Sequence, residues 1–231
     1  MIGKQGTYRH ELKYQIHFAE YLAIRQRIQS LMKLDKHASK GGYYLIRSIY
    51  FDNPDDKALR EKVDGIGKRE KFRIRYYNDD FSFVTLEKKM KHNQLCLKLD
   101  SSITKEECRA LLDGKTDWMA VHESELVREL YYKMKSQQLG PRVLVSYIRE
   151  PYVYEAGNVR VTFDSQIRTS LFHRELLEEN PYDISAQDHP GEMILEVKYD
   201  AFLPAVITDL LQIGGIRQQA FSKYGACRRF G

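Results

Sequence analysis

The chain has 231 residues, and its 37 Lys and Arg against 32 Asp and Glu leave a formal net charge of +5. Hydrophobic residues make up 42% of it, with 16 Tyr and 10 Phe, which excludes a disordered chain because such chains carry few aromatic residues. No apolar run approaches the ~18 residues of a membrane-spanning helix, and the first residues lack the apolar region of a secretory signal. We therefore expect a folded protein without a transmembrane segment.

The three cysteines, Cys96, Cys108 and Cys227, are odd in number and lack the spacing of metal ligands. This number and spacing of cysteines is typical of proteins in a reducing compartment and argues against a disulfide framework. The basic residues are not gathered in the tail or single helix face usual in nucleic-acid-binding proteins. The sequence therefore predicts a cytoplasmic protein that does not bind nucleic acid.

Alternating charged and uncharged residues predict β-strands along much of the chain, and apolar residues at helical spacing predict helices. In chain order, the expected strands are 9–16, 43–52, 71–77, 83–89, 95–99, 142–149, 152–154, 159–164 and 193–199. The expected helices are 18–34, 55–63, one that begins after Thr104, 123–139, 202–213 and a short one after Ser222. No internal repeat or low-complexity linker divides the chain, so we expect a single domain over residues 1–231.

Two of these helices have a terminal signal in the sequence. Thr104-Lys-Glu-Glu107 matches a capping box, in which the two side chains satisfy free N–H groups of the first helical turn. Gly140-Pro141 follows the helix expected over 123–139 and is typical of a helix end.

Charged residues recur on one face of several expected strands, because a strand directs residues i and i+2 to the same side. The same-face pairs are Glu11 with Lys13, Arg73 with Arg75, Glu87 with Lys89, Arg160 with Asp164, and Glu196 with Lys198. The opposite faces carry Leu12, Phe72, Ile74, Leu86, Val161, Phe163, Leu195 and Val197. A sheet face exposed to water would show the same alternation.

Two arguments favour an internal site over a solvated face. Neighbouring like charges on a sheet are unfavourable unless an anion lies between them. The strands are also too numerous and too aromatic for a flat sheet, and closing them into a barrel would place the charged faces inside. The positive charges in such an interior repel one another strongly when no anion is bound. Polyphosphate or a nucleoside triphosphate would offset that cost, and Arg is suited to phosphate oxygens.

The carboxylates on these faces have two interpretations. Glu11, Glu87 and Glu196 could be buried counter-ions that hold the basic side chains in place, or they could hold Mg²⁺ or Mn²⁺, which prefer oxygen ligands. The pattern leaves both open. No Gly-rich phosphate-binding loop is present, so a P-loop mechanism is not expected.

Eight short motifs occur in one order along the chain and carry a family resemblance. They are Arg9-His-Glu-Leu-Lys13, Ser48-Ile-Tyr-Phe-Asp52, Lys71-Phe-Arg-Ile-Arg75, Leu86-Glu-Lys-Lys89, Ser146-Tyr-Ile-Arg149, Val159-Arg-Val-Thr-Phe-Asp164, Leu195-Glu-Val-Lys198 and Ser222-Lys223-Tyr224. Together they resemble the VTC (vacuolar transporter chaperone) polyphosphate polymerase domain, within the CYTH or triphosphate tunnel metalloenzyme superfamily. The resemblance implies an α+β fold: an antiparallel eight-stranded β-barrel, the triphosphate tunnel, with peripheral helices.

The resemblance also implies an activity and its residues. VTC members transfer the γ-phosphate of ATP to a growing inorganic polyphosphate chain, with Mn²⁺ or Mg²⁺ assisting, so ATP and polyphosphate are the implied partners. The implied catalytic residues are Arg73, Arg75, Arg149, Arg160 and Glu196, with Glu196 as the metal ligand. The implied phosphate-binding residues are Lys13, Arg73, Arg75, Lys89, Lys98, Arg149, Arg160, Lys198, Ser222 and Lys223.

One departure from the superfamily pattern bears on the reaction. The wider superfamily begins with an E-x-E-x-K strand, and Arg9 replaces its first glutamate here. Losing one carboxylate favours a polymerase over a two-metal triphosphatase. An inorganic triphosphatase of the same fold and a non-catalytic polyphosphate- or nucleotide-binding module remain alternatives.

Overall fold

The computed structural model describes residues 8–93, 95–170, 177, 181–212 and 217–230. The strands are β1 (Arg9–Ile16), β2 (Lys33–Leu34), β3 (Tyr44–Asp52), β4 (Lys68–Tyr77), β5 (Asp80–His92), β6 (Leu95–Ile103), β7 (Gly140–Tyr154), β8 (Val159–Ser170), β9 (Ile184–Ser185) and β10 (Met193–Tyr199). The helices are α1 (Phe18–Ile28), α2 (Lys57–Val63), α3 (Lys105–Leu112), α4 (Glu125–Gln137), α5 (Ala205–Leu211) and α6 (Lys223–Cys227), with a 3-10 helix, η1 (Asp117–Val121), before α4.

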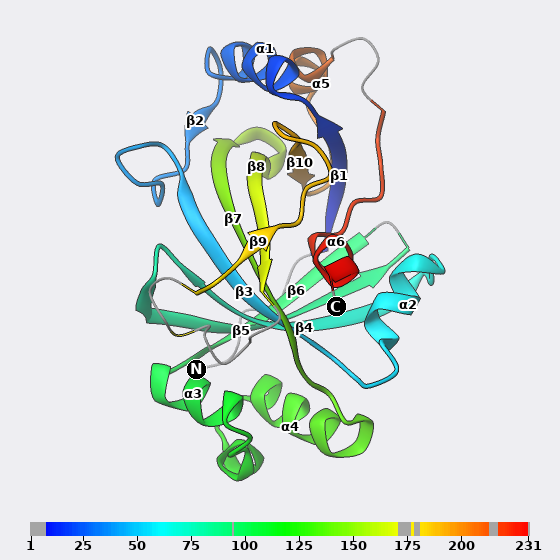
Figure 1. Cartoon of the computed structure of the whole chain (residues 1–231). Helices are drawn as coiled ribbons and strands as arrows, with labels where there is room; N and C mark the ends of the chain where they lie inside the picture. The colour runs from blue at the N-terminus through cyan, green and yellow to red at the C-terminus, as the bar shows by residue number, and fades with distance from the viewer. Residues whose placement is uncertain (1–7, 94, 171–176, 178–180, 213–216, 231) are drawn as a thin grey trace.

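Eight strands close into an antiparallel ring in the order β7-β3-β4-β5-β6-β1-β10-β8, because β7 pairs with both β3 and β8 (Figure 1). The short strands β2 and β9 extend the sheet at its margins. The ring is uneven. Within the described residues, β1 and β6 pair only through Arg9 opposite Cys96 and His10 opposite Leu95. The expected antiparallel barrel of eight strands with outer helices is therefore confirmed, although one of its seams is short.

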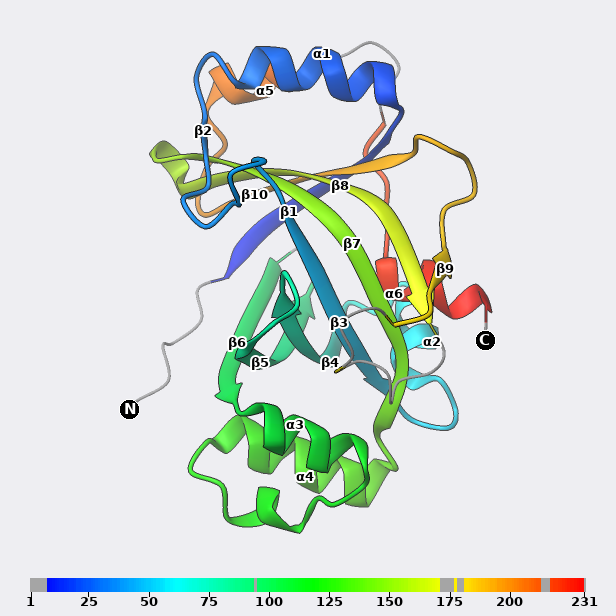
Figure 2. The same ribbon diagram turned by 60° about the vertical axis from the view of Figure 1, so that its left-hand side comes forward.

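Helices cover the outside of the ring at two ends (Figure 2). At one end, α1 and α5 lie side by side over β1, β8 and β10, and they enclose a core that includes Val161, Phe163, Leu195 and Val197. These residues were expected to point away from the charged face. Their burial under helices confirms that the charged neighbours point into the ring.

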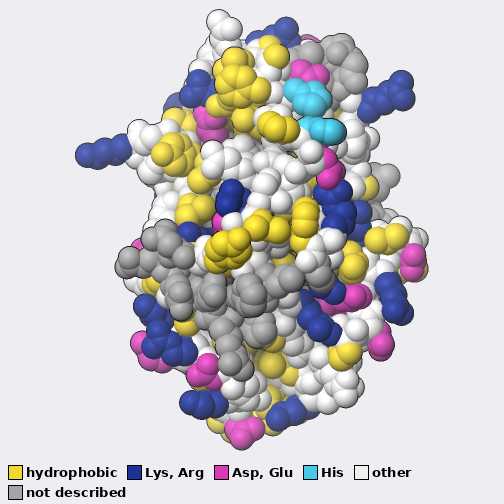
Figure 3. Space-filling view, viewed as in Figure 1, with side chains coloured by type: hydrophobic (Ala, Val, Ile, Leu, Met, Phe, Trp, Pro, Cys, Tyr) yellow, Lys and Arg dark blue, Asp and Glu magenta, His cyan; other side chains and the backbone are white. Residues whose placement is uncertain are grey.

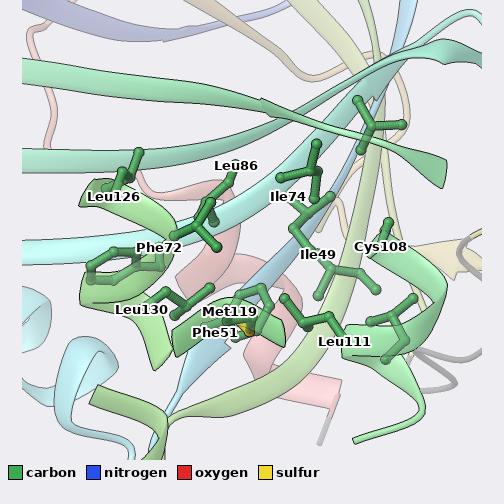
Figure 4. Packing of buried hydrophobic residues seen from close by; sticks show 14 of the residues in the cluster. Ile49, Phe51, Phe72, Ile74, Leu86, Cys108, Leu111, Met119, Leu126 and Leu130 are labelled. Carbon is green, nitrogen blue, oxygen red and sulfur yellow. The ribbon is translucent and has the colours of Figure 1, made fainter. Parts of the chain in front are cut away.

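At the other end, α3, η1 and α4 cover β3, β4 and β5 (Figure 4). Phe72, Ile74 and Leu86 pack there against side chains of the helices, such as Leu111 and Leu130. Full burial of each of these side chains stabilises the fold by about 1.5–3 kcal/mol. The two helical layers thus fix which face of every strand points inward.

A third apolar cluster shows that the interior of the ring is charged only in part. Ile46 and Tyr147 share their strand faces with inward-pointing residues, and they pack with Ile194 and with Tyr224 of α6. The short helix α6 therefore covers an apolar part of the ring.

The predicted helices and strands differ from the structure mainly at their ends. The first helix ends at Ile28 rather than Leu34. β7 runs unbroken through Pro151, where two strands were expected. Pro cannot donate to a ladder, but Pro151 lies opposite Thr162, and its carbonyl accepts the backbone N–H of Asp35 at 3.0 Å.

The capping box at Thr104 is confirmed. The Thr104 hydroxyl accepts the Glu107 backbone N–H at 3.0 Å, and the Glu107 carboxylate accepts the Thr104 N–H at 2.8 Å. All three cysteines are free thiols. Among the described residues, no helix combines the length and apolar character needed to cross a bilayer.

Candidate functional site

Basic and acidic side chains meet inside the ring in three clusters, and the first lies between β1 and β10. Lys13 is directly opposite Glu196, and Glu11 is directly opposite Lys198. Lys198 Nζ lies 2.5 Å from Glu196 Oε1, and Lys89 Nζ of β5 lies 2.7 Å from Glu11 Oε2. Lys13 Nζ lies between the two carboxylates, 3.5 Å from Glu11 and 3.9 Å from Glu196. We call these five residues the Glu11–Glu196 cluster.

Burial and charge act against each other on the pKa values in this cluster. Burial raises the pKa of the Glu11 carboxyl, but Lys13 and Lys89 outweigh it and lower the pKa to about 2. The pKa of Glu196 is likewise lowered, because Lys198 and Lys13 outweigh burial. For Lys198, burial prevails over Glu196 and Glu11, and its pKa falls to about 8. Both carboxylates are therefore ionised at neutral pH.

The second cluster surrounds Glu87 of β5. Arg73 Nε donates to Glu87 Oε2 at 2.6 Å, and Lys98 Nζ lies 3.3 Å from Glu87 Oε1. Arg75 Nη1 is 3.8 Å from the same carboxylate. Arg73 also donates to the Tyr50 hydroxyl at 2.9 Å, and burial raises the pKa of this phenol less than Arg73 and Arg75 lower it, so that it stands at about 8. This is the Glu87 cluster.

Two hydroxyl groups, in addition to the Glu87 carboxylate, hold Arg75 in place. Its Nε donates to the Ser48 hydroxyl at 3.0 Å, and its Nη2 donates to the Tyr147 hydroxyl at 3.1 Å. The Arg75 guanidinium is thus fixed by three strands, β3, β5 and β7.

The third cluster surrounds Asp164 of β8, which is completely buried. Arg149 of β7 donates two hydrogen bonds to its carboxylate, at 2.6 and 2.7 Å, and Lys223 Nζ of α6 lies 2.5 Å from Asp164 Oδ2. Arg149 Nη2 also lies 3.8 Å from Glu196, which joins this Asp164 cluster to the first.

Basic groups outnumber the carboxylates they pair with in these clusters. The basic residues are Lys13, Arg73, Arg75, Lys89, Lys98, Arg149, Lys198 and Lys223, and the carboxylates inside the ring are Glu11, Glu87, Asp164 and Glu196. Lys98 also pairs with the half-exposed Asp100, so that eight basic groups face five carboxylates. Exposure is graded across the set. The side chains of Lys98 and Lys89 are 51% and 34% exposed, whereas those of Arg149 and Lys223 are each 8% exposed. The net positive charge therefore extends from a solvent-accessible end into the interior.

Two of the predicted site residues lie outside the clusters. Arg160 pairs with Asp35 Oδ2 at 2.8 Å and donates to the Tyr44 hydroxyl. Ser222 accepts the Gly225 backbone N–H at 3.2 Å, so its hydroxyl caps α6, and it lines a cavity of about 460 Å³ beside that helix. The other predicted basic residues and Glu196 are brought together.

Sequence reasoning missed several polar residues of the clusters. Tyr50 and Tyr147 bind the two central arginines, and Asp164 was paired with Arg160 by face but not included among the site residues. Strand alternation could have found Tyr50, which lies two residues after Ser48 on the same face. No sequence signal distinguishes Tyr147 from the many packing tyrosines.

The donor groups near Glu196 fit a metal that shares its coordination with a phosphate ligand. In the described part of the chain, no group of three or more His, Cys, Asp and Glu could hold a metal alone. Thr162 lies directly opposite Glu196, and its buried hydroxyl has no hydrogen-bond partner among those residues. Mg²⁺ is usually held by one or two carboxylates together with substrate phosphates. One ionised carboxylate beside an unpaired hydroxyl suits this arrangement.

Arg9, which replaces the first carboxylate of the superfamily pattern, forms an ion pair and a hydrogen bond at the start of β1. Its Nε lies 2.8 Å from Asp200 Oδ1, and its guanidinium also donates to the Asn158 carbonyl. Arg9 therefore contributes no oxygen ligand, and its charge is paired with Asp200.

The sequence as a whole matches one family model, the VTC domain, over residues 8–230. The chain belongs to the VTC domain family. No curated protein sequence matches it significantly. Among the described residues, basic and acidic side chains are interspersed on the face of this VTC domain shown in Figure 3.

Solved structures share the fold of this VTC domain at low sequence identity. A Hippeastrum protein, described as an adenylyl cyclase candidate with a dominant triphosphatase activity, is 10% identical, with a TM-score of 0.55 over 96% of this chain and 95% of its own. A Bacillus halodurans protein, described as an adenylate cyclase candidate, is 18% identical, with a TM-score of 0.50 over 90% of this chain and 88% of its own. These similarities show the fold.

Proposed function

We propose that this VTC domain is a polyphosphate polymerase that transfers the γ-phosphate of ATP to the end of an inorganic polyphosphate chain. One observation carries the proposal: eight basic side chains from β1, β4, β5, β6, β7, β10 and α6 converge inside the ring on four carboxylates. The surplus positive charge favours an anion with several negative oxygens. Because ATP is the donor, we place the reaction in the cytoplasm.

The proposed reaction forms one P–O bond and breaks another. A terminal oxygen of the acceptor chain attacks the γ-phosphorus of ATP, and the bond from that phosphorus to the oxygen bridging it to the β-phosphate breaks. ADP leaves with the bonding electrons. The attacking oxygen is already ionised at neutral pH, so no protein group has to remove a proton. Positioning and charge stabilisation therefore provide most of the catalysis.

The arginines are the residues best placed to stabilise the transferring group. Arg73, Arg75 and Arg149 are held by carboxylates and hydroxyls before any ligand arrives. Fixed cationic donors of this kind stabilise developing charge without reorganisation. Lys13, Lys89, Lys98, Lys198 and Lys223 would neutralise the remaining phosphates, with Arg160 and Ser222 at the margins of the site.

Glu196 would hold the Mn²⁺ or Mg²⁺, as the resemblance implies and as its unpaired neighbour Thr162 supports. Held there, the ion would supply positive charge that would favour departure of ADP. Arg149 and Lys198 touch the same carboxylate and keep it ionised and oriented.

The test is to incubate the purified chain with ATP and Mn²⁺ or Mg²⁺ and to measure both ADP and polymer length. Matched production of ADP and long-chain polyphosphate supports the proposal. Release of free phosphate from tripolyphosphate without polymer identifies a triphosphatase instead. Tight phosphate binding without turnover identifies a binding module, and either result overturns the proposal.

A further inference from the structure

Three basic residues near one end of the β4–β5 ladder belong to none of the three clusters. Arg69 lies directly opposite Lys91, and Lys71 lies directly opposite Lys89. Side chains in such positions have Cβ atoms about 4.5–5.5 Å apart, and like charges there destabilise the sheet. The Arg69–Lys91 pair is therefore unfavourable in the absence of an anion, whereas in the second pair Lys89 is already compensated by Glu11.

The same three residues face the interior of the ring. Glu70 lies between Arg69 and Lys71 in β4 and pairs with Lys133 of α4, so it points to the outer helices. By strand alternation, Arg69 and Lys71 point the opposite way. Lys91 shares their face because it is directly opposite Arg69. All three are half-buried, which leaves them within reach of a ligand.

Their positive charges lack carboxylate partners. Among residues whose placement is described, no carboxylate oxygen lies within 4.0 Å of the charged group of any of the three. Arg69 donates to the Ile66 backbone carbonyl at 2.5 Å, and Lys71 Nζ lies 4.8 Å from the centre of the Tyr224 ring. By contrast, the neighbouring Lys89 is paired with Glu11.

Burial and the nearby Arg69 charge lower the pKa of both lysines. Burial lowers the pKa of Lys71 to about 8; Tyr50 and Asp52 oppose this shift, while Arg69 and Lys13 add to it. Burial and then Arg69 also lower the pKa of Lys91. An anion placed among these groups would relieve this repulsion.

We propose that Arg69, Lys71 and Lys91 form an outer anion site, which binds the part of an inorganic polyphosphate chain that extends beyond the three clusters. The inference rests on the proposed function and adds to it the route of the chain. Lys71 is directly opposite Lys89, a member of the Glu11–Glu196 cluster, so the outer site continues the row of cations. A linear polyanion can span both sites, whereas a short phosphate occupies the clusters alone.

The test compares tripolyphosphate with long-chain polyphosphate as calorimetric ligands of wild type and of the double variant Lys71→Gln, Lys91→Gln. Each removed charge should weaken long-chain binding about tenfold, because a charge-assisted contact is lost. Tripolyphosphate should bind both proteins within about twofold, since the clusters remain intact.

Lys68→Gln is the matched control. Lys68 is an exposed residue of β4 next to Arg69, so its substitution removes the same charge from the same strand outside the site. Its long-chain affinity should match wild type. The outer site is refuted if the double variant binds long chains as tightly as the Lys68→Gln control, or if it loses both ligands equally.

A second measurement separates binding from folding. Since the three cations repel one another, the double variant without ligand should melt at the wild-type temperature or above it, and a clear decrease would assign the lysines a structural role and overturn the site. A wild type that binds neither phosphate contradicts the proposed function as well. If the wild type makes polymer but the double variant binds long chains with unchanged affinity, the outer site is refuted and the proposed function is not.

Discussion

Arg149 of β7 and Asp164 of β8 lie directly opposite each other and are joined by two hydrogen bonds of 2.6 and 2.7 Å. Lys223 of α6 lies 2.5 Å from the same carboxylate. One buried anion thus fixes two basic groups that come from distant parts of the chain. Breaking a buried pair leaves uncompensated charge, which is costly.

Asp164→Asn should therefore destabilise the protein strongly. The substitution leaves Arg149 and Lys223 buried without their main counter-ion, and we expect a loss of about 3–5 kcal/mol in the free energy of unfolding. Urea denaturation of wild type and variant measures this difference. Asp100→Asn is the control, because Asp100 pairs with Lys98 at a half-exposed position and should cost at most about 1 kcal/mol. Equal effects of the two substitutions would contradict the account of the Asp164 cluster.

Arg73→Ala should slow polymer formation strongly. Loss of a fixed cationic donor should remove about 2–4 kcal/mol of transition-state stabilisation, or roughly 30- to 1000-fold in rate. Arg73→Lys keeps the charge but loses the planar fork that binds both Glu87 and Tyr50, so it should recover only part of the rate. Initial rates of ADP release give the comparison, and wild-type rates in both variants would exclude Arg73 from catalysis.

Phosphate affinity should fall as the pH rises through about 8. The pKa of Lys198 stands at about 8, so this group is mostly charged at neutral pH and mostly neutral above about pH 9. A bound phosphate favours the charged form, and binding is therefore tighter below the pKa than above it. Tyr50, whose pKa is also about 8, acts in the same direction, since its ionisation adds negative charge.

Two variants test whether this pH dependence of phosphate affinity comes from Lys198 and Tyr50. Lys198→Arg keeps the positive charge at every accessible pH, and Tyr50→Phe removes the ionising phenol. Each should flatten the decrease in tripolyphosphate affinity between about pH 7 and about pH 9.5. If wild-type affinity is constant or rises over this range, neither group is near the bound phosphate.

Glu196→Gln should raise the metal concentration needed for activity. The amide cannot supply the negative charge that Glu196 offers to a divalent ion, although its size is similar. Activity measured against Mn²⁺ concentration should shift to higher metal for the variant and reach a lower maximum. Superimposable curves for the two proteins would mean that Glu196 does not hold the metal.

The strand faces could be predicted from the sequence because apolar and charged residues alternate strictly there. Phe72 and Ile74 are buried under helices, while Arg73 and Arg75 between and after them point into the ring. The motif order then identified the ring as a barrel of the VTC type. Alternation also predicted that Glu196 and Lys198 lie together, which their 2.5 Å contact confirms.

Contacts that depend on register and on short helices could not be predicted. The meeting of Lys223 with Asp164 depends on how α6 returns to the ring, and no periodicity encodes that return. The pairing also shifts between Ser146 and Ile148, near Gln166, whose positive φ of 50° marks an irregular residue in β8. Such bulges change which side chains point inward beyond them. Ile167, which follows the bulge, joins Ile194 in the third apolar cluster.

A crystal structure of the chain with bound tripolyphosphate would show whether the basic side chains inside the ring bind phosphate. We expect a row of phosphates inside the ring, with oxygen atoms in hydrogen-bond contact with Arg73, Arg75 and Arg149 and with Lys198. Tripolyphosphate bound only on the outer surface, with the ion pairs of Glu87 and Asp164 undisturbed and no phosphate between them, would contradict it.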